Sequence, residues 1–350
     1  MKIAIIHHQF ADKGGMETYL FDLIKGFGAV NDLVDVITFK YDQNIPIPSY
    51  CTLKKKFIFL PKMLRKFYFM RNINKHFHKS DYDISLSFTR TSSQDMVICG
   101  GTHKGFLKSV SKTPLIKDFL ELYFEKKCYL ETPHIMAHSN LVKIELESLY
   151  QIDPEKIHLL YPPINTEKFN SSTRIHRNDN INSFGIDKTK TTLLFPSTGH
   201  KRKGWFELIE AFKQLPTDEF ELLIAGNKTN TFANYSNIKS LGFVKDMPAL
   251  YSACDFTILP SYYEPFGLVI IESLQCGTPV IISDMVGAKD FVTEKEGIII
   301  KDINAQNIIS AIYKARDTKF NIDSNFAQSH NLTIDYHISK IKEICKKNER

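Results

Sequence analysis

The chain has 350 residues, of which 43% are apolar and 12% are aromatic, enough to bury more than one hydrophobic core. Its formal net charge is only +6, and no apolar run approaches the roughly 20 residues of a membrane-spanning helix. Only a short apolar run precedes His7 at the N-terminus, and the six cysteines are scattered. We therefore expect neither secretion nor a membrane span, and we expect free thiols in a reducing cytoplasm.

Short apolar segments alternate with amphipathic segments along the whole chain. In the first half, the pattern predicts strands at residues 2–6, 34–39, 83–88 and 135–139, and helices at 16–27 and 116–130. In the second half, it predicts strands at 191–197, 220–226, 238–244, 256–261, 279–283 and 297–301, and a helix at 204–214. This alternation is typical of parallel βαβ units and predicts an α/β fold with two doubly wound parallel sheets.

The segment between the two halves has a different composition. Residues 162–190 are rich in Asn, Ser, Thr, Pro and charged residues and lack periodic apolar positions. We therefore predict a first domain at 1–165, a linker at 166–190 and a second domain at 191–330. Ligands in such sheets bind at the carboxyl ends of the strands.

The most informative segment is 261–280, where Glu264 and Glu272 lie eight positions apart around a helix that begins near Gly267. The first N–H groups of that helix, around Phe266, Gly267 and Leu268, have no intrahelical partner and favour an anion such as a phosphate. A pair of Glu residues at this spacing also arises by chance in many helices. The surrounding residues decide between these interpretations.

Four elements occur in this segment in a fixed order: Pro260-Ser261, Glu264-Pro265-Phe266-Gly267, Glu272, and Gly277-Thr278-Pro279-Val280. Together they resemble the signature of the family 4 glycosyltransferases, which are retaining enzymes that use nucleotide sugars. The resemblance implies the GT-B fold, in which two Rossmann-like domains face each other across a cleft. It also implies that the C-terminal stretch 331–350 packs back on the first domain. Within the family, the chain is similar to lipopolysaccharide-core glucosyltransferases.

A second motif places two cations, Arg202 and Lys203, directly before Gly204 at the start of a predicted helix. Two cations there are unfavourable for the helix, whose N-terminus already carries positive partial charge, so an anionic partner is expected. The resemblance implies that the pair holds the donor diphosphate and stabilises it as it leaves. The family's Gly-Arg element is replaced here by Thr198-Gly199-His200, so the cation is assigned to Arg202. The alternative is a solvated basic loop.

The resemblance also assigns roles around the donor. It implies that Glu272 accepts hydrogen bonds from the ribose, that Glu264 orients the donor hexose, and that the base packs near Gly226, Phe243 and Val244.

In the first domain, Gly14 and Gly15 follow the first strand and permit close approach of the backbone to a ligand. With Glu17 they resemble the Gly-Gly-x-Glu of the family, whose loop lies near the donor phosphates. The stretch 100–107 resembles the corresponding stretch of the lipopolysaccharide-core enzymes, which implies that His103 contacts the transferred sugar. For His103 the alternative is a simple loop histidine. Ser139 matches a serine that faces the cleft in the family, and for it the alternative is a helix cap.

The run 54–79 contains nine Lys or Arg residues, no Asp or Glu, and many interleaved aromatic and aliphatic residues. Such a basic amphipathic segment is typical of contact with an anionic membrane surface, where each basic residue contributes about 1 kcal/mol. Nucleic acid is a rival partner, but the low net charge and the lack of any nucleic-acid motif argue against it. A third interpretation is that the apolar residues are core and the lysines are solvated.

The sequence thus predicts a retaining glycosyltransferase that moves a hexose from a nucleoside diphosphate sugar, expected to be a UDP-sugar. The expected acceptor is a lipopolysaccharide, a lipid-linked glycan or another cell-envelope glycan. No cofactor, no obligatory metal and no nucleic acid are expected. The expected location is the cytoplasm, with peripheral contact to the inner face of the cytoplasmic membrane. The alternatives are a GT-B nucleotide-sugar epimerase and a catalytically silent membrane- or carbohydrate-binding protein.

Overall fold

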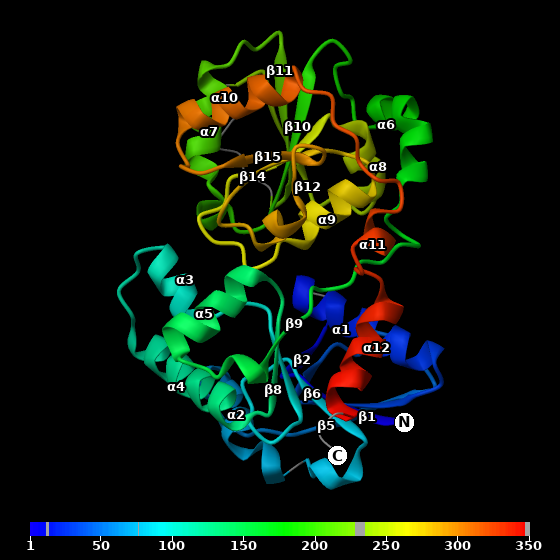
Figure 1. The fold of residues 1–350 in the computed structure, drawn as a ribbon, viewed down its shortest axis with the longest axis vertical. Coiled ribbons are helices and arrows are strands. Elements are labelled where there is room, and N and C mark those ends of the chain that lie inside the picture. Colours follow the sequence, from blue (N-terminus) through cyan, green and yellow to red (C-terminus); the bar gives the residue numbers. More distant parts are fainter. Residues whose placement is uncertain (12–13, 76, 228–234, 347–350) are drawn as a thin grey trace. The chain divides into compact units, whose positions relative to one another are not determined.

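The computed structural model describes residues 1–11, 14–75, 77–227 and 235–346. The chain divides into two compact units (Figure 1). The first unit contains Met1–Pro163 and Thr333–Arg350, and the second contains Ile164–Leu332.

The first unit is built on a parallel sheet with the order β5-β3-β1-β6-β7-β8-β9. Its strands are β1 Lys2–Ile6, β3 Leu33–Thr38, β5 Cys51–Lys55, β6 Ile84–Ser87, β7 Met96–Cys99, β8 His134–Ala137 and β9 Ile157–Leu159. A short parallel pair joins β2 (Gln9–Phe10) to β4 (Lys40–Tyr41). The helices are α1 Gly15–Ala29, α2 Lys62–Asn72, α3 His103–Ser109, α4 Ile116–Glu131, α5 Asn140–Tyr150 and α12 Ile334–Lys346. Short 3-10 turns follow at η1 Ile73–Lys75, η2 Lys79–Asp81 and η3 Pro154–Lys156.

Strand β1 lies inside this sheet, and its residues are apolar on both faces. Ile3 and Ile5 belong to one core cluster, and Ala4 and Ile6 belong to a second. A strand covered on both sides reads as a continuous apolar run, which is how residues 2–6 appear in the sequence.

The second unit has a six-stranded parallel sheet with the order β12-β11-β10-β13-β14-β15. Its strands are β10 Thr191–Ser197, β11 Phe220–Gly226, β12 Ile238–Gly242, β13 Phe256–Leu259, β14 Val280–Ser283 and β15 Gly297–Ile300. Its helices are α6 Arg177–Ser183, α7 Trp205–Gln214, α8 Met247–Ala253, α9 Leu268–Gln275, α10 Ala305–Arg316 and α11 Phe326–Ser329, with 3-10 turns at η4 Ser171–His176, η5 His200–Lys203 and η6 Gly287–Phe291. Helices α7 and α10 lie side by side (Figure 1).

The prediction that residues 166–190 form a linker is wrong for most of this segment. Residues 171–183 form η4 and α6, which pack on α8 inside the second unit. Polar anchors hold them there: Arg177 donates to the carbonyl oxygens of Ser252 and Cys254, and Asn180 Nδ2 donates to Ser252 Oγ at 2.8 Å.

Helix α12 packs against α1 of the first unit, with Ile338 and Ile341 buried in its core (Figure 1). Residues 347–350 of the stretch that was expected to pack there lie outside the described residues.

All six cysteines are free thiols, five of them buried. Within the part of the chain that the structure describes, no helix is both long and apolar enough to cross a membrane.

Candidate functional site

The candidate site of the second unit lies where the strand order reverses. Strands β10 and β13 are neighbours, but β10 continues to β11 on one side and β13 continues to β14 on the other. At such a point, the loops after the two strands diverge and leave room for a ligand at the carboxyl edge. Arg202 and Lys203 follow β10, and Glu264 follows β13.

These three side chains meet. Arg202 Nη1 lies 3.2 Å and Lys203 Nζ 3.8 Å from Glu264 Oε2. That oxygen is buried and has no partner in hydrogen-bonding geometry within the described structure, although both cations are near it. The two cations therefore share one carboxylate, and together they keep an excess positive charge.

Backbone contacts hold the two loops together. The N–H of Tyr262 donates to the carbonyl of Arg202 at 3.0 Å, and Arg202 Nη1 donates to the carbonyl of Tyr263. Gly204 has φ +73°, and a Cβ there would lie 1.9 Å from the carbonyl oxygen of Pro260. Only glycine allows this approach, so the residue after the basic pair is fixed by the contact between the loops.

Burial lowers the pKa of Lys203, and Arg202 lowers it further, whereas Glu264 and Glu272 raise it. An ammonium group with a lowered pKa beside a second cation stabilises an incoming anion more than an exposed lysine would.

Helix α9 begins at this edge without a side-chain cap. Its N-cap residue, Gly267, has φ +93° and makes no side-chain cap hydrogen bond. Phe266 is buried and Leu268 is half-buried. The first-turn amides near Leu268 are therefore suited to an anionic ligand. One turn later, Glu272 Oε2 accepts a hydrogen bond of 2.9 Å from Tyr251.

Gly226 is the last residue of β11, and Phe243 and Val244 follow the carboxyl end of β12, on the same edge of the sheet. Gly226 has φ +134°, and a Cβ there would lie 2.0 Å from the carbonyl oxygen of Ser197. The side chain of Phe243 is 81% exposed. The structure thus brings Arg202, Lys203 and Glu264 into contact and places Gly226, Phe243 and Val244 at the same edge of the sheet.

In the first unit, Gly14 precedes α1 with φ +110°, and Gly15 begins the helix. Glu17 Oε1 accepts a hydrogen bond of 3.2 Å from Gln9 and lies 3.7 Å from His7 Nε2. Burial raises the pKa of Glu17, but the nearby His7 ring and the charge of Lys40 outweigh it, and the net pKa of Glu17 is lowered. These residues lie where β1 and β6 adjoin, the reversal point of the first sheet.

His103 is the first residue of α3 and contacts α4. Its backbone N–H donates to Glu125 Oε2 at 2.8 Å, and its Nε2 lies 3.0 Å from Asp118 Oδ1. The backbone hydrogen bond from Leu115, followed by contacts with Lys112 and His103, outweighs burial and lowers the pKa of Asp118 to about 2. His103 lines a pocket of about 590 Å³ together with Phe67, Phe106 and several charged side chains.

Ser139 is the N-cap of α5, and its Oγ accepts a hydrogen bond of 3.2 Å from the N–H of Val142. This contact fits the capping interpretation of Ser139.

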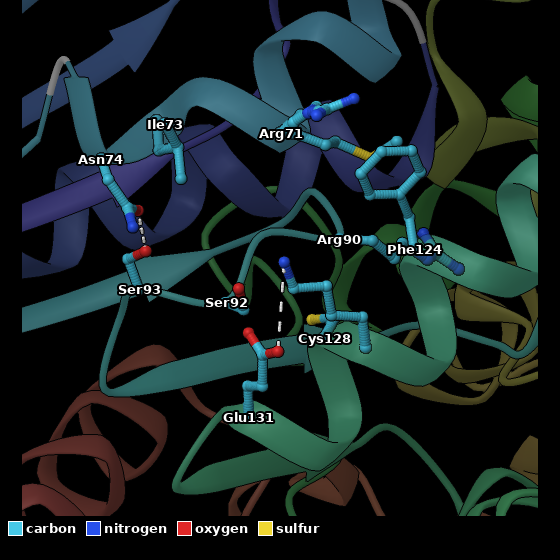
Figure 2. Close-up of a pocket in the computed structure, with 11 residues that line it drawn as sticks. Arg71, Ile73, Asn74, Arg90, Ser92, Ser93, Phe124, Cys128 and Glu131 are labelled. Atoms are coloured by element: carbon cyan, nitrogen blue, oxygen red, sulfur yellow. Dashed lines mark hydrogen bonds and ion pairs between the residues drawn. The ribbon is translucent and has the colours of Figure 1, made fainter.

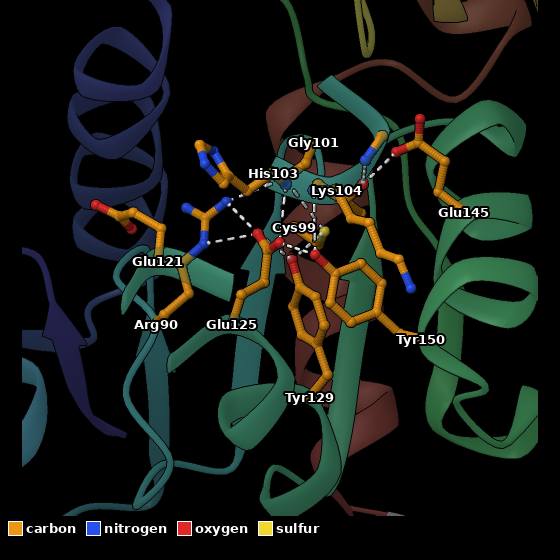
Figure 3. A network of polar contacts seen from close by, with 12 residues as sticks. Arg90, Cys99, Gly101, His103, Lys104, Glu121, Glu125, Tyr129, Glu145 and Tyr150 are labelled. Atoms are coloured by element: carbon orange, nitrogen blue, oxygen red, sulfur yellow. Dashed lines mark hydrogen bonds and ion pairs between the residues drawn. The ribbon is translucent and has the colours of Figure 1, made fainter. Parts of the chain in front are cut away.

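A polar network that the sequence did not suggest lies below His103 (Figure 3). The carboxylate of Glu125 is buried and accepts from Arg90 Nη2 at 2.8 Å, from Tyr129 at 3.1 Å and from Tyr150. Arg90 Nη2 also donates to the carbonyl of Gly101 at 3.0 Å. Five donors on one carboxylate fix the loop that carries His103.

A smaller pocket of about 120 Å³ lies between α2, the segment around Ser92 and α4 (Figure 2). Ser93 donates to Asn74 at its rim. Ligand pockets usually start at about 300 Å³, so this space is too small for a sugar residue. Among the described residues, no group of three or more His, Cys, Asp or Glu side chains could hold a metal ion.

Two family models match the chain: residues 13–168 match "Glycosyltransferase Family 4", and residues 176–328 match "Glycosyl transferases group 1". A "Probable transglycosylase" of Burkholderia thailandensis is 30% identical over 82% of this chain and 78% of its own. This chain belongs to the group 1, family 4 glycosyltransferases. It is therefore a transferase enzyme, and the prediction of its family is confirmed.

Solved structures agree with the GT-B fold of this glycosyltransferase. WaaG, "a glycosyltransferase involved in lipopolysaccharide biosynthesis", matches with a TM-score of 0.76 at 17% identity, over 98% of this chain and 95% of its own. The Anabaena protein HepE, solved in complex with UDP-glucose, matches with a TM-score of 0.72 at 17% identity, over 99% of this chain and all of its own.

Proposed function

We propose that this glycosyltransferase moves a hexose from a UDP-sugar to a cell-envelope glycan, either a lipopolysaccharide or a lipid-linked saccharide, with retention at the anomeric carbon. The observation that carries the proposal is the contact of Arg202 and Lys203 with Glu264 at the reversal point of the second sheet. The HepE complex with UDP-glucose supports the choice of donor, and the involvement of WaaG in lipopolysaccharide biosynthesis supports the class of acceptor.

In this proposal, the donor diphosphate lies against Arg202, Lys203 and the first turn of α9. Negative charge accumulates on the diphosphate as the glycosidic bond breaks, so two cations and unpaired amides stabilise the transition state more than the ground state. Glu272 accepts hydrogen bonds from the ribose, and Glu264 orients the hexose. The departing phosphate takes the acceptor's proton, and neither a cofactor nor a metal takes part.

The donor site is tested by measuring release of the nucleoside diphosphate (UDP, GDP or ADP) from a panel of UDP-, GDP- and ADP-sugars with purified enzyme. We expect Arg202→Gln and Glu264→Gln each to lower turnover by about 100-fold, the usual effect of removing one charge-stabilising or positioning group. Lys201→Gln is the matched control, because Lys201 is an exposed cation in the same loop and should leave turnover unchanged. Equal turnover in all four proteins would refute the assignment.

The products test the reaction itself. With an acceptor, we expect UDP and a new glycoside whose anomeric configuration, read by NMR, equals that of the donor. An isomerised nucleotide sugar formed without acceptor would instead indicate an epimerase. Mass spectrometry of surface glycans from a strain that lacks this protein, which should lose one hexose, tests the acceptor class.

We also propose that the first unit contacts an anionic membrane surface through residues 54–79. Part of this run is core, since Phe69 and Ile73 are buried. Phe57 and Phe59, however, are 90% and 93% exposed, and they follow three consecutive lysines. Exposed aromatic side chains next to cations fit a lipid interface. His76 lies outside the described residues.

Sedimentation with vesicles tests this contact. Vesicles with anionic lipid should retain the wild-type enzyme at low salt, and the double variant Phe57→Ser, Phe59→Ser should remain in solution. Phe206→Ser is the control, because Phe206 is 62% exposed on α7 of the second unit and lies outside the run. Equal retention of the double variant and the control would refute membrane contact through these two rings.

A further inference from the structure

The second unit has a pocket of about 740 Å³ at the edge of its sheet opposite to the candidate donor site. Thr191 begins β10, Phe256 begins β13 and Pro279 directly precedes β14, and all three line the pocket. Arg202 and Glu264, in contrast, follow the carboxyl ends of β10 and β13. A strand of seven residues, such as β10, is about 20 Å long, so the two sites are separate.

The lining of this pocket is strongly positive. Five cationic side chains line it: Arg174, Lys188, Lys190, Arg316 and Lys319. The only lining carboxylate is Asp255. It already accepts from Arg177 at 2.6 Å and from the N–H of Thr192 at 2.8 Å. Asp255 is therefore neutralised by a cation outside the lining. Lys190 lies 3.9 Å from Asp187 and Arg316 pairs with Glu219 at 2.9 Å, so the uncompensated charge belongs to Arg174, Lys188 and Lys319.

Arg174 is the most telling of the five cations. It is half-buried, and its Nη1 donates to Thr278 Oγ1 at 2.8 Å. No carboxylate lies within ion-pair distance of it in the described residues. A Cβ on Gly277 would lie 2.9 Å from its Cδ, so its stem lies tightly against the backbone. Burial, followed by the charge of Arg177, lowers its pKa. A half-buried guanidinium with four unused donors favours an anionic ligand.

Two further cations have no partner. Lys188 and Lys319 are exposed and make neither a hydrogen bond nor an ion pair with any described residue. The pocket beside His103 in the first unit differs in this respect. There, Lys66 pairs with Glu121 at 2.7 Å and Lys112 pairs with Asp118 at 3.1 Å. Among the described residues, only the exposed Lys117 of that pocket lacks a carboxylate partner, whereas the sheet-edge pocket has three such cations, one of them the half-buried Arg174.

We propose that this pocket binds a phosphomonoester of a small hydroxylated molecule, such as a sugar phosphate. A guanidinium fork and two mobile ammonium groups match the oxygens of a phosphate. The rings of Phe256 and Phe320, 5.9 Å apart and edge to face, supply an apolar surface for the rest of the ligand. The volume lies within the range of small-molecule sites. The ligand is neither donor nor acceptor, and no bond is made or broken there.

Calorimetric titration with glucose 6-phosphate, in the presence of saturating UDP, tests the proposal. Because UDP occupies the donor site, any glucose 6-phosphate that still binds must bind at a different site. We expect saturable binding of one equivalent to the wild-type enzyme. Arg174→Gln and Lys319→Gln should each weaken it by about tenfold or more, the usual loss for a charge-assisted hydrogen bond. Lys301→Gln is the matched control, because Lys301 is exposed and follows β15 at the opposite edge.

Three results would overturn the proposal: no binding to the wild-type enzyme, equal affinity in Lys319→Gln and Lys301→Gln, or equal binding of glucose and glucose 6-phosphate. Lys319 is exposed, so its variant keeps the fold even if Arg174→Gln does not. A separate titration with UDP alone compares the UDP affinity of the wild-type enzyme with that of Lys203→Gln. It tests the donor site without involving the second pocket. The two proposals can therefore fail separately.

Discussion

Lys203 is the more buried of the two cations beside Glu264: its side chain is 12% exposed, whereas that of Arg202 is 30% exposed. This difference explains why burial lowers the pKa of Lys203. In the proposed function, the protonated form of Lys203 holds the donor diphosphate. As the pH rises through the lowered pKa, the ammonium group loses its proton and donor binding weakens.

We therefore predict that kcat/KM for the donor falls at alkaline pH, with a midpoint below the ordinary lysine value of 10.5. In Lys203→Arg this alkaline limb should disappear, because a guanidinium stays charged. A pH profile of initial rates, measured for both proteins, checks this. An unchanged limb in the variant would show that another group titrates.

Glu125 gives a second prediction at this scale. Replacing it with Gln keeps its size but removes the charge that compensates Arg90 and places an N–H₂ group among donors. We expect Glu125→Gln to lower the free energy of unfolding by about 3 kcal/mol, as breaking a buried ion pair does. Denaturant titration measures it.

The control for this variant lies on the same helix. Glu131 is 49% exposed and lies 4.0 Å from Lys127, so Glu131→Gln should change stability by less than about 0.5 kcal/mol. Equal effects of the two substitutions would mean that the network around Glu125 contributes no more than a surface pair.

At the scale of elements, the loop after β10 depends on one glycine. In Gly204→Ala, the new Cβ would meet the carbonyl oxygen of Pro260 at a backbone angle unfavourable for alanine. We expect a loss of stability of about 1–3 kcal/mol and a loss of UDP affinity, because the loops carrying Arg202 and Glu264 must separate. Thermal unfolding and UDP titration measure both.

Gly199 lies in the same loop, and a Cβ there has nothing within 4 Å. Gly199→Ala is therefore expected to leave stability and UDP affinity almost unchanged. If Gly204→Ala also leaves stability and UDP affinity almost unchanged, the two loops can accommodate the added Cβ without loss of stability.

The elements also show what the sequence can predict. Strands with long apolar runs, such as β10 and β11, were predicted within their observed bounds, because burial on both faces leaves a continuous signal. Strand β7 was missed, and so were β5 and β9 at the two edges of the first sheet. The segment 171–183 was mistaken for a linker because Arg177 and Asn180 hold it by hydrogen bonds, which leave no apolar pattern.

The same limit applies to the site. That Arg202, Lys203 and Glu264 lie close together could be predicted, because a motif of adjacent residues marks each loop and the parallel topology brings the loops to one edge. Glu125 could not, because its partners come from α3, α5 and the segment after β6, far apart in the sequence. A weak signal existed: Glu125 lies on the same face of α4 as the buried Cys128 and Tyr129.

For the whole molecule, the first unit is formed by both ends of the chain, since α12 closes the core that begins with β1. Ile341 is fully buried in that core, next to Leu20 and Leu23 of α1 in the same cluster. We expect Ile341→Ala to lower the free energy of unfolding of the first unit by about 2–5 kcal/mol, because the substitution leaves a cavity. Peptides of residues 1–163 should then exchange amide hydrogens faster, whereas peptides of 164–332 should keep their protection.

Ile144→Ala, at a position 59% exposed on α5, is the control. Equal loss of protection in both units would show that they unfold as one cooperative body, and no loss in 1–163 would show that α12 is dispensable for the core.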